Sequence, residues 1–246
     1  MSEGDLDALR RVRYVASTGP VAALGGGTFA DVPLSIYVHG TPGDAKGWAG
    51  YLADVPGGGE ALAIDRPGFG ASEPRRAVRS LADQAAAIAP LLGDEGDPAV
   101  VLIGHSLGAP IAAWVATEFP ERVAGLALIA GSMAPELERR RWFNYVAAFF
   151  WPVLPRAIRN SNDEVWRFKE QLELLEARLD RVKCPVLIVH GERDSLVPVE
   201  NAEVSADALA GSSAIEVVRY DDAGHLLIWS RFDDVHAILD RWIRGL

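Results

Sequence analysis

A serine between two glycines is the pattern in this sequence with the clearest chemical potential. Ser106 stands in a Gly-x-Ser-x-Gly pentapeptide (104–108) that follows the apolar run 100–103 without a linker. Helix-forming residues come next, and Pro110 falls in the first turn, where its missing N–H removes no hydrogen bond. A sharp strand-to-helix turn needs small neighbours and projects its central side chain. We therefore expect Ser106 to be a nucleophile.

A serine hydroxyl is a weak nucleophile near neutral pH and needs a base within hydrogen-bond reach. Histidine is the usual base, and the chain has five. His225 follows the predicted strand 214–220 through a small Ala-Gly step, which allows a tight loop. We expect His225 to be the base. The other four are expected to be structural, at strand ends beside glycine or on a solvated helix face: His39, His105, His190 and His236.

Acyl transfer also needs two N–H donors aimed at the carbonyl oxygen as it becomes an oxyanion, and losing one costs about 2.7–4 kcal/mol. The backbone N–H of Leu107, just after the serine, is one candidate. The loop 39–43, after the predicted strand 34–38, would supply the other. Pro42 has no N–H, so we expect Thr41 to be the second donor.

These motifs together resemble the α/β-hydrolase family. The shared features are the serine turn, the His-Gly-x-Pro loop, the Asp-x-Pro-Gly-x-Gly-x-Ser turn at 65–72 and the Gly-His pair ending at His225. The resemblance spans nearly the whole chain and implies an α/β-hydrolase fold. That fold is a mostly parallel sheet of about eight strands flanked by helices, with a small helical lid inserted after the sixth strand.

The resemblance also implies where the third catalytic group stands. The family places its acid at the tip of a strand, and Asp194 matches that position after the predicted strand 185–189. Thr41 matches the family's oxyanion donor. The turn at Asp65 is structural in the family. The alternative acids are Glu192, Asp222 and Glu136.

Strands and helices alternate along most of the chain. The start looks antiparallel (12–15 and 21–24), and the triple glycine 25–27 is expected to be a flexible break. Alternation lapses after residue 131. We expect a core of residues 1–131 and 183–246, and a helical lid of residues 132–182.

The lid is expected to contain a basic and aromatic stretch (139–151) and a second helix capped by Asn162. Three readings of the aromatics stay open. They could pack the lid onto the body, roof an apolar acyl pocket, or lie on a membrane surface.

Composition sets outer limits on function. With 246 residues, 49% of them hydrophobic, the chain suits one α/β domain with an insertion. A net charge of −10 argues against nucleic acid or an anionic membrane as the main partner. The single cysteine, Cys184, excludes an internal disulfide and is expected to be buried and inert. We find no signal peptide and no run of about 20 apolar residues, so we expect a cytoplasmic protein without a membrane span.

The sequence therefore predicts a serine hydrolase that needs no cofactor or metal and cleaves carboxylic esters of small to medium, apolar acyl substrates. Trp48, Leu196 and Leu226 are candidate pocket residues. Alternatives with the same catalytic groups are a carbon–carbon bond hydrolase, a lactonase and an amidase or iminopeptidase-like enzyme. A non-catalytic ligand-binding protein of this fold is a further alternative, whereas nothing favours a scaffold role. The natural substrate and the oligomeric state do not follow from the sequence.

Overall fold

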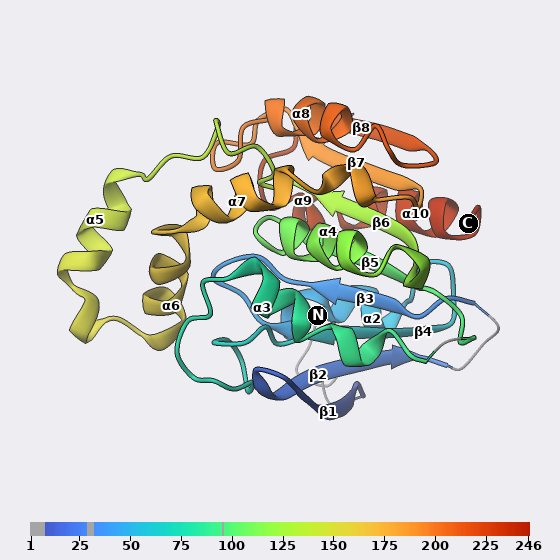
Figure 1. Cartoon of the computed structure of the whole chain (residues 1–246), viewed down its shortest axis with the longest axis horizontal. Coiled ribbons are helices and arrows are strands. Elements are labelled where there is room, and N and C mark those ends of the chain that lie inside the picture. The colour runs from blue at the N-terminus through green and yellow to red at the C-terminus, as the bar shows by residue number, and fades with distance from the viewer. Residues whose placement is uncertain (1–7, 29–31, 95) are drawn as a thin grey trace.

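The computed structural model describes residues 8–28, 32–94 and 96–246, which are organised around one eight-stranded sheet (Figure 1). The strand order is β1-β2-β4-β3-β5-β6-β7-β8. The strands are β1 Arg10–Ala16, β2 Gly19–Gly27, β3 Ser35–Val38, β4 Glu60–Ile64, β5 Val100–His105, β6 Val123–Ile129, β7 Val186–Gly191 and β8 Ile215–Tyr220. β2 pairs antiparallel with β1 and β4, and all other neighbours pair parallel. The mostly parallel eight-stranded sheet is confirmed.

Helices cover both faces of the sheet, which is why the central strands are apolar throughout. Along β3, Ile36 and Val38 belong to the core on one face, whereas Tyr37 belongs to the core on the other. The first face is covered by α3 (Leu81–Ala86), α4 (Gly108–Glu118), α7 (Phe168–Glu176) and α8 (Glu200–Ala208). The second face is covered by α2 (Ala49–Ala53), α9 (Leu227–Ser230) and α10 (Phe232–Ile243).

The expected flexible break at residues 25–27 is wrong, because these glycines form the end of β2. Gly26 pairs with Ala61 of β4. A Cβ on Gly26 would lie 1.9 Å from the carbonyl oxygen of Leu52, so glycine here lets α2 pack directly on the strand. The glycine run is therefore a packing surface rather than a hinge.

The chain leaves the sheet between β6 and β7 to form α5 (Trp142–Phe149), α6 (Arg156–Val165) and α7. In Figure 1, α5 and α6 protrude on the side toward which β6 and β7 point. The expected helix starting at Asn162 is wrong, since Asn162 lies inside α6 and accepts a hydrogen bond from Asn144 of α5. A separate helix begins at Phe168 and buries Leu172 and Leu175 in the main core. The division at 132–182 stays a prediction.

No helix in the described parts of the chain is long and apolar enough to cross a bilayer. Cys184 is buried, as expected, and burial raises the pKa of its thiol to about 11. A thiol held protonated in this way is a poor nucleophile at neutral pH.

Candidate active site

Ser106 occupies the sharp turn between β5 and α4. Its φ is 55°, in the left-handed region that a non-glycine residue adopts only at a cost of about 1–3 kcal/mol. The turn is held on both sides: the Ser106 N–H donates to the Ile129 carbonyl oxygen, and the Ala109 N–H donates to the Ser106 carbonyl oxygen, each over 3.0 Å. This strained backbone sets the hydroxyl at the carboxyl edge of the sheet.

Glycine on each side of Ser106 is required by close backbone packing. A Cβ on Gly104 would lie 2.5 Å from the Gly108 carbonyl oxygen, and a Cβ on Gly108 would lie 2.2 Å from the Val38 carbonyl oxygen. The 39–43 loop also presses on the serine, because a Cβ on Gly40 would lie 2.8 Å from the Ser106 Cβ. Side chains at these glycines would force the turn open.

We expect Gly104→Ala to lower the free energy of unfolding by about 2–3 kcal/mol, because the added methyl meets backbone atoms that cannot turn aside. The matched control is Gly245→Ala, whose Cβ would meet its nearest atom at 3.4 Å. That control should change stability by no more than about 0.5 kcal/mol. Urea denaturation of both variants measures the difference, and equal midpoints and slopes for the two would contradict the packing argument.

Three side chains from separate parts of the sequence form one hydrogen-bonded row. The His225 Nε2 lies 3.0 Å from the Ser106 Oγ, and the His225 Nδ1 lies 2.8 Å from Asp194 Oδ2. Asp194 follows β7 and His225 follows β8, so the turns after neighbouring strands bring them together. A neutral imidazole that donates Nδ1–H to the carboxylate keeps its Nε2 lone pair for the serine proton.

Asp194 is held as a carboxylate by several donors. Its Oδ1 accepts hydrogen bonds of 2.8 Å from the N–H groups of Leu196 and Val197. The His190 Nε2 lies 3.4 Å from its Oδ2. Burial alone would raise the pKa of Asp194. The hydrogen bonds from His190 and His225 lower it by more than burial raises it, so the pKa lies well below its usual range. His190, which the sequence suggested only as a structural residue, is thus a second partner of the acid.

This low pKa predicts a pH-dependent stability. The pKa of Asp194 is lower in the folded chain than in the unfolded chain, where it is about 3.9. Ionised Asp194 therefore stabilises the fold above about pH 3.9, and this stabilisation is lost as the pH falls below that value. The difference in unfolding free energy between the wild type and Asp194→Asn should therefore narrow from about pH 6 to about pH 3. Urea denaturation at each pH measures it. A difference that grows toward acid would contradict the assigned ionisation.

The alternative acids lie elsewhere. Glu192 and Asp222 form surface ion pairs with Arg219 and Arg231, respectively, and Glu136 is exposed.

Two of the other histidines have structural contacts. The His105 ring centroid lies 5.0 Å from that of His225, and the His105 Nε2 lies 3.0 Å from the His225 carbonyl oxygen. Burial lowers the pKa of His105 to about 3, so it is neutral and donates this bond through Nε2–H. The His236 Nε2 lies 2.9 Å from the Asp54 carbonyl oxygen, and His236 is not part of the row.

A cavity of about 540 Å³ opens over Ser106 and His225. The candidate pocket residues Trp48, Leu196 and Leu226 all line it. Of residues 132–182, Ala157 lines the cavity, and the aromatic residues of that segment whose side chains the structure describes are not part of the lining. The expectation that aromatics roof the pocket stays a prediction. The described lining contains no lysine or arginine. In the described part of the chain, no group of three or more His, Cys, Asp or Glu residues could hold a metal ion.

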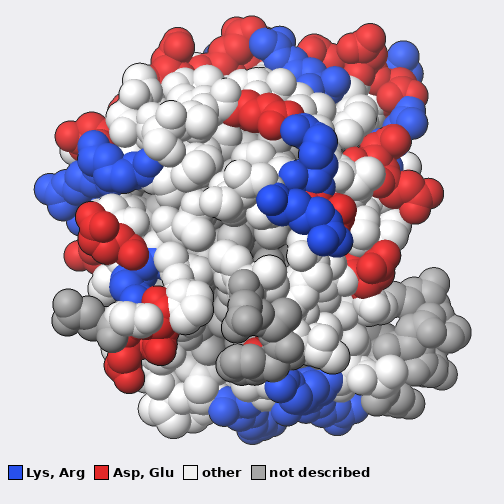
Figure 2. All heavy atoms as spheres, turned by 90° about the vertical axis from the view of Figure 1, so that its right-hand side faces the viewer, with Lys and Arg blue, Asp and Glu red and all other residues white. Residues whose placement is uncertain are grey.

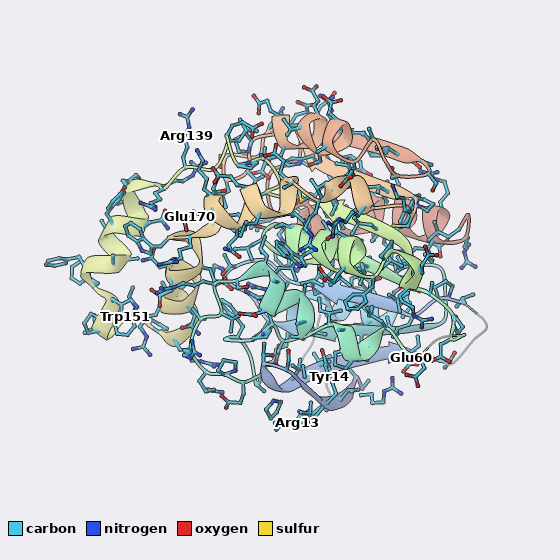
Figure 3. The ribbon with its side chains drawn as sticks, viewed as in Figure 1. Arg13, Tyr14, Glu60, Arg139, Trp151 and Glu170 are labelled. Atoms are coloured by element: carbon cyan, nitrogen blue, oxygen red, sulfur yellow. The ribbon has the colours of Figure 1, made fainter. Side chains whose placement is uncertain are left out.

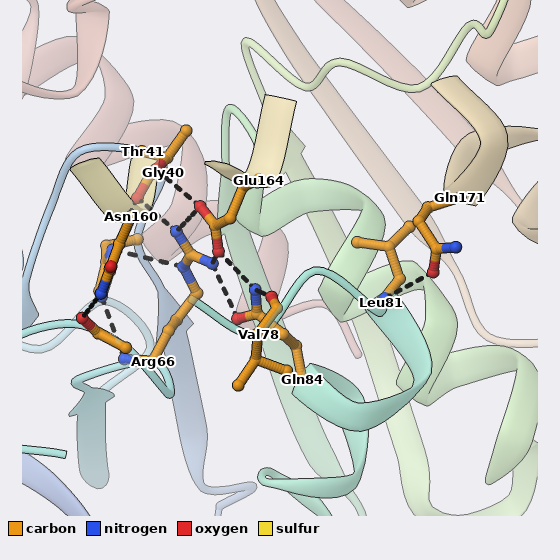
Figure 4. A network of polar contacts seen from close by, with 11 residues as sticks. Gly40, Thr41, Arg66, Val78, Leu81, Gln84, Asn160, Glu164 and Gln171 are labelled. Atoms are coloured by element: carbon orange, nitrogen blue, oxygen red, sulfur yellow. Dashed lines mark hydrogen bonds and ion pairs between the residues drawn. The ribbon is translucent and has the colours of Figure 1, made fainter. Parts of the chain in front are cut away.

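A buried ion pair joins the turn after β4 to α6, and the 39–43 loop bonds to its acidic member (Figure 4). Arg66 is fully buried, and its Nη1 donates to Glu164 Oε1 of α6 over 2.8 Å and to the Gln84 side chain over 2.7 Å. Glu164 Oε2 accepts from the Thr41 hydroxyl over 2.7 Å. Each Glu164 oxygen therefore has at least two donors, which offsets the cost of burying the charges. Sequence reasoning placed Arg66 in a structural turn and missed Glu164.

The same arginine fixes the Gly40–Thr41 peptide. The Gly40 carbonyl oxygen accepts from Arg66 Nη2 over 3.0 Å and lies 2.7 Å from His39 Nδ1. His39 Nε2 accepts from the Arg66 backbone N–H, so Nδ1 carries the ring proton and donates to Gly40. Burial lowers the pKa of His39 well below its usual range, which keeps the ring neutral. His39 therefore braces the loop.

Comparisons with known proteins agree with this architecture. A family model described as "Alpha/beta hydrolase family" matches residues 36–238. The dihydrolipoyllysine-residue acetyltransferase component of the acetoin cleaving system of Cupriavidus necator is 27% identical, over 98% of this chain and 68% of that protein. The 2-hydroxy-6-oxononadienedioate/2-hydroxy-6-oxononatrienedioate hydrolase of Klebsiella pneumoniae is 26% identical to this chain. The match covers 83% of this chain and 84% of that hydrolase.

A solved structure shows the same likeness of fold. The 2-hydroxy-6-oxo-6-phenylhexa-2,4-dienoate hydrolase of Rhodococcus sp. strain RHA1 superposes with a TM-score of 0.80. The match covers 96% of this chain and 99% of that one, at 21% sequence identity. The shared fold therefore extends over nearly the whole chain.

Proposed function

Because this chain belongs to the alpha/beta hydrolase family, we propose that it is a serine hydrolase that cleaves carboxylic esters with small to medium, apolar acyl groups. The observation that carries the proposal is the row Ser106–His225–Asp194, with hydrogen-bond distances of 3.0 and 2.8 Å. A hydroxyl, an imidazole and a carboxylate in this order form the arrangement that activates a serine for acyl transfer.

The proposed reaction has two halves. His225 Nε2 takes the Ser106 proton as Oγ attacks the ester carbonyl, and the resulting imidazolium then protonates the leaving alcohol. Water next attacks the acyl-serine, again with His225 as the base, and the acid is released. Asp194 stays ionised and stabilises the imidazolium without taking its proton.

The N–H groups of Thr41 and Leu107 are the proposed oxyanion donors. The C=O and N–H of a trans peptide point in opposite directions. Since Arg66 and His39 hold the Gly40 carbonyl oxygen, we assign the Thr41 N–H to the opposite side of that peptide, the side of Ser106. Leu107 is the N-cap residue just before α4, and the N-terminus of that helix also favours negative charge.

The lining of the cavity disfavours an anionic substrate. The described lining supplies no lysine or arginine to pair with a substrate carboxylate, and Trp48, Leu226 and Ile228 give it an apolar wall. The relative from Klebsiella favours a second candidate, hydrolysis of a 2-hydroxy-6-oxo-dienoate type acid by the same serine. Hydrolysis of a lactone or an amide would use the same serine, histidine and aspartate.

We expect a cytoplasmic location for the protein.

Stopped-flow kinetics with p-nitrophenyl acetate, butyrate, hexanoate and decanoate test the proposal. We expect a burst of p-nitrophenol equal to the enzyme concentration, followed by slower turnover, since an acyl-enzyme accumulates when deacylation is slow. Turnover should be faster for butyrate and hexanoate than for decanoate. A lack of turnover with all four esters, together with hydrolysis of a 2-hydroxy-6-oxo-dienoate, would favour the second candidate.

A further inference from the structure

Helix α5 turns its apolar side chains toward solvent, whereas a helix that packs on a globular core turns them inward. Its apolar stripe at spacings of three and four residues is exposed by 44–80%: Trp142, Tyr145, Val146 and Phe149. Asn144, on the other side of the helix, is only 8% exposed and donates to Asn162 of α6. A helix normally turns its apolar stripe inward. Polar contacts thus hold α5 so that its apolar side faces outward.

The exposed apolar surface continues past the helix. Phe150, Trp151 and Val153 are exposed by 49%, 43% and 78%. With the α5 stripe they make up seven of the fifteen exposed large apolar side chains in the described parts of the chain. We call these seven residues the lid surface. Contiguous apolar surface of this kind marks an interaction site.

The charged residues of the segment that carries the lid surface all have one sign, although Glu138, Glu170 and Glu173 of flanking segments lie beside Tyr145. Residues 139–162 contain five arginines and no lysine, aspartate or glutamate, in a chain whose net charge is −10. None of these five arginines forms an ion pair with a described residue. Arg139 projects from the upper end of the lid, and Trp151 lies at its lower end (Figure 3). On the face at the opposite end of the molecule, acidic and basic side chains lie next to one another (Figure 2).

We propose that the lid surface docks on an anionic phospholipid bilayer, with α5 lying in the plane of the interface. An aromatic stripe bordered by arginines is the combination that such helices use, since the rings enter the headgroup region while the guanidinium groups meet phosphates. Each arginine near an anionic surface contributes about 1 kcal/mol. The acidic remainder of the chain opposes this only weakly, because charges more than about 8–10 Å from the bilayer are screened.

A second copy of the chain fits the lid surface less well. Packing two lid surfaces about a two-fold axis would bring the arginines of both copies together without an acidic partner in the 139–162 stretch. A bilayer supplies apolar volume and negative charge at once.

Docking would also bring the cavity close to the bilayer. Arg141 Nη2 donates to the Leu196 carbonyl oxygen over 2.9 Å, and both Leu196 and Ala157 of α6 line the cavity. An ester dissolved in the bilayer could then reach Ser106 over a short path. This last step rests on the proposed hydrolase function, whereas the docking itself does not.

Flotation of the purified full chain with phosphatidylcholine vesicles, with and without phosphatidylglycerol, tests the docking. We expect the wild type to float with the anionic vesicles and much less with the neutral ones. Phe149→Ser with Val153→Ser should weaken binding about tenfold or more. Arg139→Glu should weaken it about thirtyfold, because the reversal changes the charge by two. None of these residues lines the cavity, so turnover of a water-soluble p-nitrophenyl ester should be unchanged.

Two controls carry the same chemical changes on exposed positions of β1. Arg13→Glu repeats the charge reversal, and Val15→Ser removes an apolar side chain that is 76% exposed. Both should bind vesicles within about twofold of wild type. The proposal is overturned if wild type does not float with anionic vesicles, or if the lid variants bind as the controls do. Light scattering that shows a dimer dissociated by Phe149→Ser would assign the lid surface to a second copy instead.

The vesicle test and the function test can fail separately. Ser106→Ala should still float with anionic vesicles. Normal flotation without turnover of any ester would leave the docking surface standing and remove the hydrolase proposal.

Discussion

Ser106→Ala is expected to lower kcat for p-nitrophenyl butyrate by about 10⁵–10⁶-fold, the size of loss seen when the nucleophile of a serine triad is removed. The remaining rate would come from substrate binding and the oxyanion donors alone. The change removes one oxygen at a residue that is 8% exposed, so the thermal unfolding midpoint should stay close to that of wild type. Steady-state rates with a circular dichroism melt measure both quantities.

The matched variants are His225→Ala and the double variant Ser106→Ala with His225→Ala. Since the two side chains act as one unit across a 3.0 Å hydrogen bond, the double variant should be no slower than either single variant. Losses that multiply would show that the two groups act independently. That result would contradict the proposed row.

Arg66→Met is expected to lower kcat about a hundredfold with little change in KM. Arg66 holds the Gly40 carbonyl oxygen, so its loss releases the peptide that carries the Thr41 N–H, and losing one oxyanion donor costs about 10²–10³-fold in kcat. The variant also leaves Glu164 as an unpaired buried charge, which costs about 3–5 kcal/mol of stability. Loss of fold and loss of positioning must therefore be separated.

The double variant Arg66→Met with Glu164→Met separates them. Replacing both members of a buried ion pair with apolar residues of similar volume is often neutral for stability, so the unfolding free energy should recover most of the loss. The kcat should stay low, because nothing then holds the Gly40 carbonyl oxygen except His39. Recovery of kcat together with stability would show that Arg66 is only structural.

The residues at strand ends were predictable because local sequence patterns determine their backbone. Gly104 and Gly108 meet backbone atoms within 2.5 Å of an added Cβ, so the glycine pattern around Ser106 reports the turn directly. Asp194 follows β7, whose apolar run the sequence shows, and His225 follows β8, which the sequence predicts as the last strand. The parallel sheet then brings these ends together.

The contacts that α5 and α6 make could not be predicted in the same way. Glu164 reaches Arg66 across 98 positions of sequence, and no local pattern marks which buried charge pairs with which. The direction in which α5 turns its apolar stripe depends on the contact of Asn144 with Asn162, because an isolated amphipathic helix has no inside or outside. The prediction of a flexible break at glycines 25–27 was wrong because the composition of this stretch does not show that α2 packs against its backbone.

Labelling with a fluorophosphonate followed by peptide mass spectrometry tests the central claim most directly, since the reagent bonds to a serine only when a base activates it. We expect one adduct per chain, on Ser106, with labelling about 10³-fold slower or more in His225→Ala. An adduct on another serine, no adduct at all, or an unchanged rate in His225→Ala would contradict the claim that Ser106, His225 and Asp194 work as one catalytic unit.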